Sequence, residues 1–182
     1  MTTKWIGMVL LAAAANLALA QENLREFETR RDVTYATHDG VELKGDYYVP
    51  KAAGKYPVLV AVHGGGWTAG AKATYRYWGP YLAQRGIALF SIDYRLAKPD
   101  HPSFPGAVQD IRAAIQYVKG KAVDLKADPD HVGLIGDSAG GHLVALTGLA
   151  ADKAPFAGRS AERHAFKDHG EVQGHFGQAP DQ

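Results

Sequence analysis

The chain has 182 residues, a formal net charge of +1 and a hydrophobic fraction of 46%. This length and composition suit one globular domain, and the even charge balance argues against a nucleic-acid partner. The sequence contains no cysteine. Disulfides, thiolate metal sites and a cysteine nucleophile are therefore excluded.

Residues 1–20 have the pattern of a secretory signal peptide, because Lys4 precedes an apolar run and small residues stand at Ala18 and Ala20. We expect cleavage after Ala20 and a secreted or periplasmic protein. The alternatives are a membrane-spanning anchor and an ordinary amphipathic helix. The apolar run is shorter than the roughly 20 residues that cross a bilayer, and it has no polar face. We therefore expect no stable membrane anchor.

A folded domain is expected over residues 21–150, and its first half is rich in strand patterns. Residues 32–49 form two short runs around a glycine turn, which predicts a β-hairpin at one edge of a sheet. The continuous apolar runs at 58–62, 87–92 and 131–136 predict strands that are covered on both faces.

Helical patterns alternate with these strands. Residues 74–85 form a weak one, because Gly79 and Pro80 interrupt it. A second helix begins near Pro105, and a third runs to about Ala150. The apolar positions of the second helix step by three and four: Val108, Ile111, Ile115 and Val118. This alternation predicts an α/β fold with a mostly parallel sheet flanked by helices.

Residues 151–182 have a different composition from the rest of the chain. They contain no Ile, Leu, Tyr or Trp and a single Val. Such a segment buries too little apolar surface to offset the entropy of ordering it. We expect a disordered carboxyl-terminal tail.

Ser138 lies where a predicted strand passes into a predicted helix, with Gly136 and Gly140 two residues to either side. This is the G-x-S-x-G pattern, in which a sharp turn exposes a serine hydroxyl above a sheet. The N–H of Ala139 and the helix dipole can then meet a developing negative charge. A turn without chemistry is the alternative, since glycine and serine are common in turns.

A second glycine cluster, "HGGGW", directly follows the apolar run at 58–62. Consecutive glycines at a strand end allow main-chain N–H groups to face a bound oxygen. A flexible loop and a phosphate-binding loop are the alternatives, but no Gly-Lys-Ser/Thr sequence opens a helix here. The two clusters together describe a serine nucleophile beside an oxyanion hole.

Roughly residues 30–150 resemble the α/β-hydrolase superfamily, in the esterase branch related to hormone-sensitive lipase and to bacterial feruloyl and acetyl esterases. The resemblance implies an incomplete α/β-hydrolase fold and a carboxylic ester hydrolase that uses no metal or cofactor. The matching motifs occur in order: "HGGGW" at 63–67, "DYRLA" at 93–97, "FPGAVQD" at 104–110 and "DPDHVGLIGDSAGGHL" at 128–143.

The same resemblance assigns a role to individual residues. Ser138 would be the nucleophile, and Gly65, Gly66 and Ala139 would donate to the oxyanion. Other residues of the motifs would be structural, with His63 holding the glycine loop in shape: Asp93, Arg95 and Asp110.

The base and acid that activate such a serine follow it in chain order in this fold, as Asp or Glu and then His. Only 44 residues follow Ser138. They offer Asp168 with His169 or His175 as a shortened triad. The alternative, which we favour, is an unrelated ending such as a frameshifted or truncated reading frame would produce. We therefore expect this chain to lack the acid and base.

Three hypotheses for function remain. The first is a serine carboxylesterase that acts on a small-molecule or polysaccharide-linked ester. The second is a non-catalytic remnant or binding protein, and the third is a peptidase of the same fold. A trypsin-like protease is excluded because such proteases are all-β.

Without further strands, the strand at 131–136 would expose an unpaired edge, so we expect edge-to-edge self-association.

Overall fold

A computed structural model describes residues 24–38 and 40–150. The predicted signal peptide at 1–20 and the predicted tail at 151–182 lie outside these residues. Within them, no helix combines the length and the apolar character that a membrane span requires.

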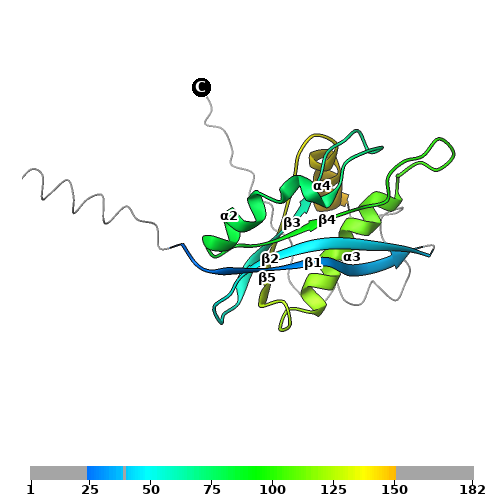
Figure 1. The fold of residues 1–182 in the computed structure, drawn as a ribbon. Helices are drawn as coiled ribbons and strands as arrows, with labels where there is room; N and C mark the ends of the chain where they lie inside the picture. Colours follow the sequence, from blue (N-terminus) through cyan, green and yellow to red (C-terminus); the bar gives the residue numbers. More distant parts are fainter. Residues whose placement is uncertain (1–23, 39, 151–182) are drawn as a thin grey trace, which may run out of the picture.

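The described chain forms one five-stranded sheet (Figure 1). Its strands lie in the order β1-β2-β4-β3-β5. β1 pairs with β2 and β2 with β4 in antiparallel fashion, whereas β3 pairs in parallel with both β4 and β5. The bounds are β1 Phe27–His38, β2 Val41–Pro50, β3 Tyr56–Val62, β4 Ala88–Ile92 and β5 Ala127–Gly136.

The predicted hairpin is confirmed, and β1 starts earlier than expected, at Phe27. Its pairing with β2 shifts register twice, between Arg30 and Val33 and between Thr34 and Ala36. The first of these shifts includes Asp32, whose φ is 54°. β5 also starts before the predicted residue 131, because Ala127 already pairs with Tyr56 ahead of a register shift.

In the described part of the chain, a 3-10 helix and two α-helices connect strands, and a third α-helix follows β5. The weak pattern at 74–85 becomes two short elements, with Gly79 and Pro80 in the first turn of the second one. Proline is tolerated there because the first turn of a helix leaves its N–H groups without helical partners. The bounds are η1 Lys72–Tyr75, α2 Trp78–Gln84, α3 Gly106–Gly120 and α4 Ala139–Ala150.

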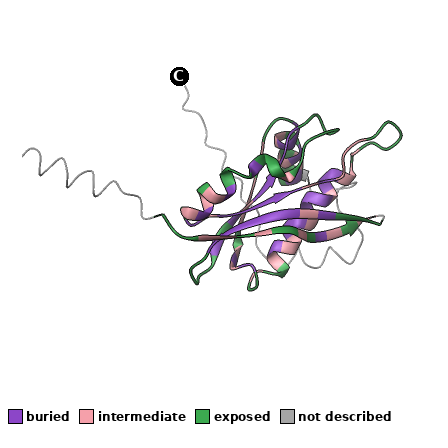
Figure 2. Ribbon diagram, viewed as in Figure 1, coloured by how far each residue is buried: buried purple, intermediate pink, exposed green. Residues whose placement is uncertain are grey.

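The helices cover the two faces of the sheet unequally. α3 and α4 pack on one face, where the larger core cluster includes Val60, Phe90 and Ile111. η1 and α2 pack on the other face, where Tyr48 and Leu89 belong to a smaller cluster. Figure 2 shows this buried interior running along the central strands. The predicted α/β architecture with flanking helices is confirmed.

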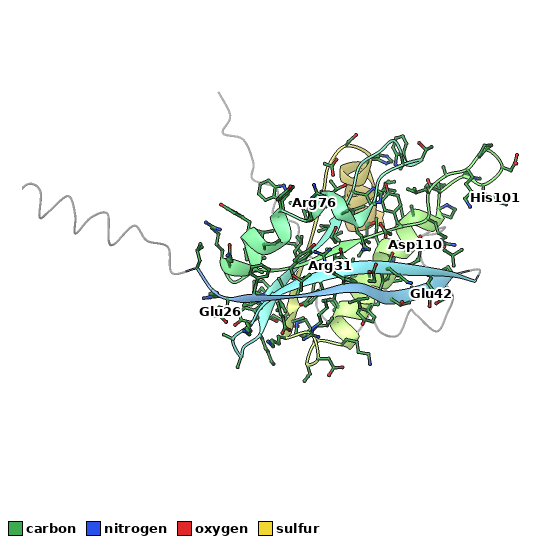
Figure 3. All side chains as sticks on the ribbon, in the orientation of Figure 1. Glu26, Arg31, Glu42, Arg76, His101 and Asp110 are labelled. Carbon is green, nitrogen blue, oxygen red and sulfur yellow. The ribbon has the colours of Figure 1, made fainter. Side chains whose placement is uncertain are left out.

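The apolar stripe predicted for α3 is buried, since Val108, Ile111 and Val118 are fully covered and Ile115 is 9% exposed. Asp110 lies in the same helix, next to the strands, and is also fully buried (Figure 3). Its carboxylate accepts hydrogen bonds from the Arg95 main-chain N at 2.9 Å and from Arg95 Nη2 at 2.7 Å. This pair fixes the chain after β4 to α3, as expected for structural residues.

β5 is the last strand of the sheet in the described part of the chain, and its outer edge has no partner strand there. On the α2 side of the sheet, Ile135 is 38% exposed. Nearby, Leu59, Ile87 and Val132 help to line an open depression in the surface. The predicted unpaired edge is therefore present among the described strands.

The Asp110→Ala substitution should lower the free energy of unfolding by about 3 kcal/mol, because it leaves the Arg95 guanidinium without its carboxylate. This value is at the low end for a buried ion pair, since the Arg95 side chain is 24% exposed to solvent. Equilibrium unfolding in urea measures the loss. Asp124→Ala, at an exposed position, is the control and should change stability little. Equal effects of the two substitutions would contradict the structural role of Asp110.

Candidate active site

The two glycine clusters meet where β3 and β5 end side by side. Val62 and Gly136 are parallel partners in the last register position of these strands. Just beyond these residues, the Gly64 N–H donates to Asp137 Oδ1 at 3.1 Å. A Cβ atom placed on Gly64 would lie 3.2 Å from the Ser138 Cβ. The structure thus brings the "HGGGW" loop against the serine turn, as the sequence analysis expects.

Ser138 occupies a sharp strand-to-helix turn. Its φ is 48°, in the left-handed region that a serine rarely adopts. The helix forms at once, since the Gly140 N–H donates to the Asp137 carbonyl at 2.8 Å and the His142 N–H to the Ser138 carbonyl at 3.1 Å. Ser138 itself is exposed. Backbone strain at a turn that exposes a hydroxyl is a feature of nucleophile sites.

Close approach of main chains explains both motif glycines. A Cβ atom on Gly136 would lie 2.5 Å from the Gly140 carbonyl carbon, and one on Gly140 would overlap the Val62 carbonyl. Any side chain at either position would push α4 away from the ends of β3 and β5. The glycines therefore fix the distance between the helix that follows Ser138 and the sheet.

The glycine loop turns through three successive residues with positive φ: 116° at Gly65, 59° at Gly66 and 64° at Trp67. The Gly65 carbonyl accepts hydrogen bonds from the N–H groups of Thr68 and Ala69, at 3.2 and 3.0 Å, which closes the turn. Both glycines are exposed. Successive residues in such conformations can aim their N–H groups at one anion.

Three N–H groups at this end of the sheet have no acceptor among the described residues. Within residues 24–38 and 40–150, neither Gly65 nor Gly66 nor Ala139 donates its N–H in a hydrogen bond. Main-chain donors normally find partners. An oxygen of a bound molecule could serve as the acceptor.

Asp137 joins the elements around the candidate site, and the sequence analysis did not single it out. Its Oδ1 accepts hydrogen bonds from the Gly64 N–H and from the Tyr75 hydroxyl, each at 3.1 Å. Burial, and secondarily the Asp137 carboxylate, raises the pKa of Tyr75 well above its usual range. Asp137 thereby ties η1, the glycine loop and the serine turn together. Its position beside Ser138 was the available signal.

His63 supports the loop as predicted. Its ring stacks on Tyr94 with centroids 4.4 Å apart, and its Nδ1 lies 2.7 Å from the Gly64 carbonyl. The Tyr94 hydroxyl donates to the His63 carbonyl at 3.0 Å. A Cβ atom on Gly70 would overlap the His63 ring, so the end of the loop packs directly on this histidine.

Lys72 anchors the far end of the same loop to the sheet. Its Nζ lies 2.8 Å from Asp46 Oδ1 and 3.1 Å from Asp32 Oδ1, and its N–H donates to Asp93 Oδ1 at 2.7 Å. Burial alone would lower the pKa of Lys72, but the two carboxylates raise it above its ordinary value. Asp93 therefore has the structural role that the resemblance implied.

None of the described histidines is hydrogen-bonded to the Ser138 hydroxyl. The His142 ring instead packs against the Trp67 ring in a T-shaped arrangement, with centroids 5.6 Å apart. His131 pairs with Asp128 at 2.9 Å, near the opposite end of β5. The candidates for a shortened triad lie outside the described residues: Asp168, His169 and His175. Within the described ranges, no group of three or more potential ligands from His, Asp and Glu could hold a metal ion.

The Gly140→Ala substitution should destabilise the protein, because the new methyl group overlaps the Val62 carbonyl and forces α4 away from the sheet. Gly148→Ala is a matched control in the same helix, with no atom within 4 Å of the added Cβ. That control should be neutral or raise stability by up to about 1 kcal/mol, as alanine favours helix. Denaturant midpoints compare the two variants. A Gly140→Ala protein as stable as Gly148→Ala would refute the close contact.

Comparisons with known proteins identify the family. The family model described as BD-FAE matches residues 46–175. Carboxylic ester hydrolase LipN of Mycobacterium tuberculosis is 38% identical over 154 residues, which cover 82% of this chain and 40% of LipN. Carboxylesterase NlhH of the same species is 31% identical, over 76% of this chain and 46% of NlhH. The chain thus spans less than half the length of these two relatives.

Solved structures give the same result. A bacterial heroin esterase is 34% identical with a TM-score of 0.62, over 79% of this chain and 45% of its own. Esterase Est2 of Thermogutta terrifontis is also 34% identical, with a TM-score of 0.59 over 65% of this chain and 42% of its own. The chain therefore belongs to the BD-FAE family, in the esterase and lipase branch of the α/β-hydrolase superfamily.

Proposed function

We propose that the protein is a serine-dependent carboxylic ester hydrolase with Ser138 as nucleophile. The observation that carries the proposal is the set of three N–H groups without acceptors, at Gly65, Gly66 and Ala139, next to a strained, exposed serine. Such donors stabilise the oxygen anion that forms when a carbonyl is attacked. The esterase relatives support the same chemistry.

The reaction would proceed through an acyl-enzyme. The Ser138 oxygen forms a bond to the ester carbonyl carbon and loses its proton, and the carbonyl oxygen becomes an anion held by the three N–H groups. Collapse of this intermediate releases the alcohol, which takes up a proton. Water then attacks the acyl-serine, releases the carboxylic acid and restores the hydroxyl.

Proton transfer from Ser138 requires a base, and the described part of the chain holds no histidine on its hydroxyl. We propose that the chain provides the nucleophile and the oxyanion donors but lacks an acid and base. An oxyanion hole and substrate binding without a complete triad still accelerate such reactions about 10³-fold over water. Slow turnover is therefore expected from this chain. Because no histidine of the described residues is bonded to the Ser138 hydroxyl, a second candidate is a binding protein that recognises esters without cleaving them.

For substrate and location, the proposal keeps the expectations from the sequence. Ser138, Gly65 and Gly66 are all exposed, so an ester on a small molecule or on a polysaccharide could reach them. Residues 1–20 support a secreted or periplasmic location.

Covalent labelling tests the nucleophile directly. An organophosphate such as paraoxon should phosphorylate Ser138, with loss of p-nitrophenol, and mass spectrometry of peptides locates the added group. Ser138→Ala should not be labelled, and its slow release of p-nitrophenol from p-nitrophenyl acetate should change little, because a serine without its base adds little to the turnover that the oxyanion donors supply. Ser103→Ala, a serine outside the site, is the control. Labelling at another residue, or no labelling of Ser138, would leave the binding-protein hypothesis.

We also propose that the open edge of β5 pairs with a second copy of the chain. A strand edge with unpaired N–H and C=O groups beside exposed apolar side chains is a template for such pairing. Ile135 lies in this strand and is 38% exposed.

The Ile135→Lys substitution should weaken self-association, because a charge on an edge strand opposes pairing with another strand. Sedimentation velocity over a range of concentrations should show dimers of the wild-type protein and mainly monomers of the variant. Val123→Lys, at a position 89% exposed outside the sheet, is the control and should leave the dimer intact. A wild-type monomer at all concentrations would disprove the proposal.

A further inference from the structure

The negative charges of this chain are distributed unevenly along the sequence. Residues 47–92 contain no Asp or Glu, whereas five cations lie in this range: Lys51, Lys55, Lys72, Arg76 and Arg85. Lys72 is engaged by two carboxylates at the sheet. Arg76 and Arg85 instead lie at exposed positions on either side of α2, and Figure 3 shows Arg76 beside that helix.

The outer face of α2 carries exposed aromatic rings. Tyr77, Trp78 and Tyr81 are 74, 57 and 47% exposed, whereas Gly79 and Ala83 of the same segment are buried toward the sheet. We call these three residues the aromatic stripe. Aromatic side chains normally bury most of their large apolar surface. Packing against the sheet does not account for rings on this face.

The side chains of the stripe are already arranged against one another. The Trp78 and Tyr81 rings meet edge to face, with centroids 5.8 Å apart. The Arg76 guanidinium lies 4.9 Å from the centre of the Tyr77 ring, and that of Arg85 lies 3.8 Å from the centre of Tyr81. Groups that are ordered before binding lose less entropy when a ligand arrives.

This combination of groups specifies the chemistry of a ligand. The flat rings of Tyr and Trp stack on the apolar faces of sugar rings. Arg76 Nη2 donates to the Tyr77 hydroxyl at 3.3 Å and Arg85 Nη1 to the Tyr81 carbonyl at 3.1 Å, and a guanidinium has five N–H groups, so it can bind a carboxylate in addition to such a bond. The residues from Tyr77 to Arg85 extend about 12 Å along the helix, at 1.5 Å per residue. A ligand that spans them is a chain of rings with carboxylates rather than a single ring.

We propose that the aromatic stripe, together with Arg76 and Arg85, binds an acidic polysaccharide, that is, a chain of sugar rings that include uronic acids. The argument rests on charge complementarity between these arginines and sugar carboxylates, and it does not depend on the proposed esterase chemistry. An anionic membrane is less favoured. Interfacial helices insert a broad apolar face, whereas Leu82 in α2 is partly buried against the sheet.

Affinity electrophoresis in gels that contain polygalacturonate tests the proposal, with neutral dextran gels as the reference. The wild-type protein should be retarded by polygalacturonate and not by dextran. Two variants should each weaken this binding about tenfold, as expected for residues that carry most of a binding energy. They are the triple variant Tyr77→Ala, Trp78→Ala, Tyr81→Ala and the double variant Arg76→Gln, Arg85→Gln.

The matched control combines Lys121→Gln with Val123→Ala, an exposed cation and an exposed apolar residue outside α2, and should bind like the wild type. Circular dichroism checks that every variant folds. If the triple variant unfolds, Tyr77→Ala alone replaces it, since that ring is 74% exposed.

Several outcomes would overturn the proposal. They are absence of retardation by polygalacturonate, equal retardation by dextran, and variants that bind like the wild type. Stronger binding to phosphatidylserine vesicles than to polygalacturonate would assign the surface to a membrane. Loss of self-association in the triple variant would assign it to a second copy of the chain. The readout is binding, so a failure here leaves the labelling of Ser138 unaffected.

Discussion

The close contact between the ends of β3 and β5 is the constraint on which the rest of the site depends. These strands are parallel neighbours up to Val62 and Gly136, and the helix after Ser138 packs so tightly on them that Gly140 leaves no room for a side chain beside the Val62 carbonyl. Because the strands end together, the glycine loop that follows β3 lies directly beside the serine turn that follows β5.

Hydrogen bonds, a ring stack and an ion pair hold the glycine loop and the serine turn in place. Asp137 accepts from Gly64 and from Tyr75, so the serine turn, the loop and η1 are joined through one carboxylate. His63 and Tyr94 pack beneath the loop, and Lys72 fixes its far end to the carboxylates of the sheet. The strained backbone at Ser138 persists because its surroundings over-determine it.

The surface around this framework divides into parts with different character. One face of the sheet is covered by α3 and α4 over a large core, whereas the other is covered by η1 and α2 and leaves part of β5 open. α2 itself turns small residues inward and aromatic residues outward. The site for ester chemistry, the open strand edge and the aromatic stripe are thus separate features of one small domain.

The class of fold and the candidate nucleophile could be predicted from the amino-acid sequence, because these depend on local patterns. Continuous apolar runs predicted β3, β4 and β5, a stripe with helical spacing predicted α3, and the glycines around Ser138 predicted a sharp turn. The hydrogen bond from the Gly64 N–H to Asp137, the split of residues 74–85 and the early start of β5 become visible only in the folded protein. Asp137 and Gly64 are 73 residues apart, and strand pairing rather than any local periodicity brings such residues together.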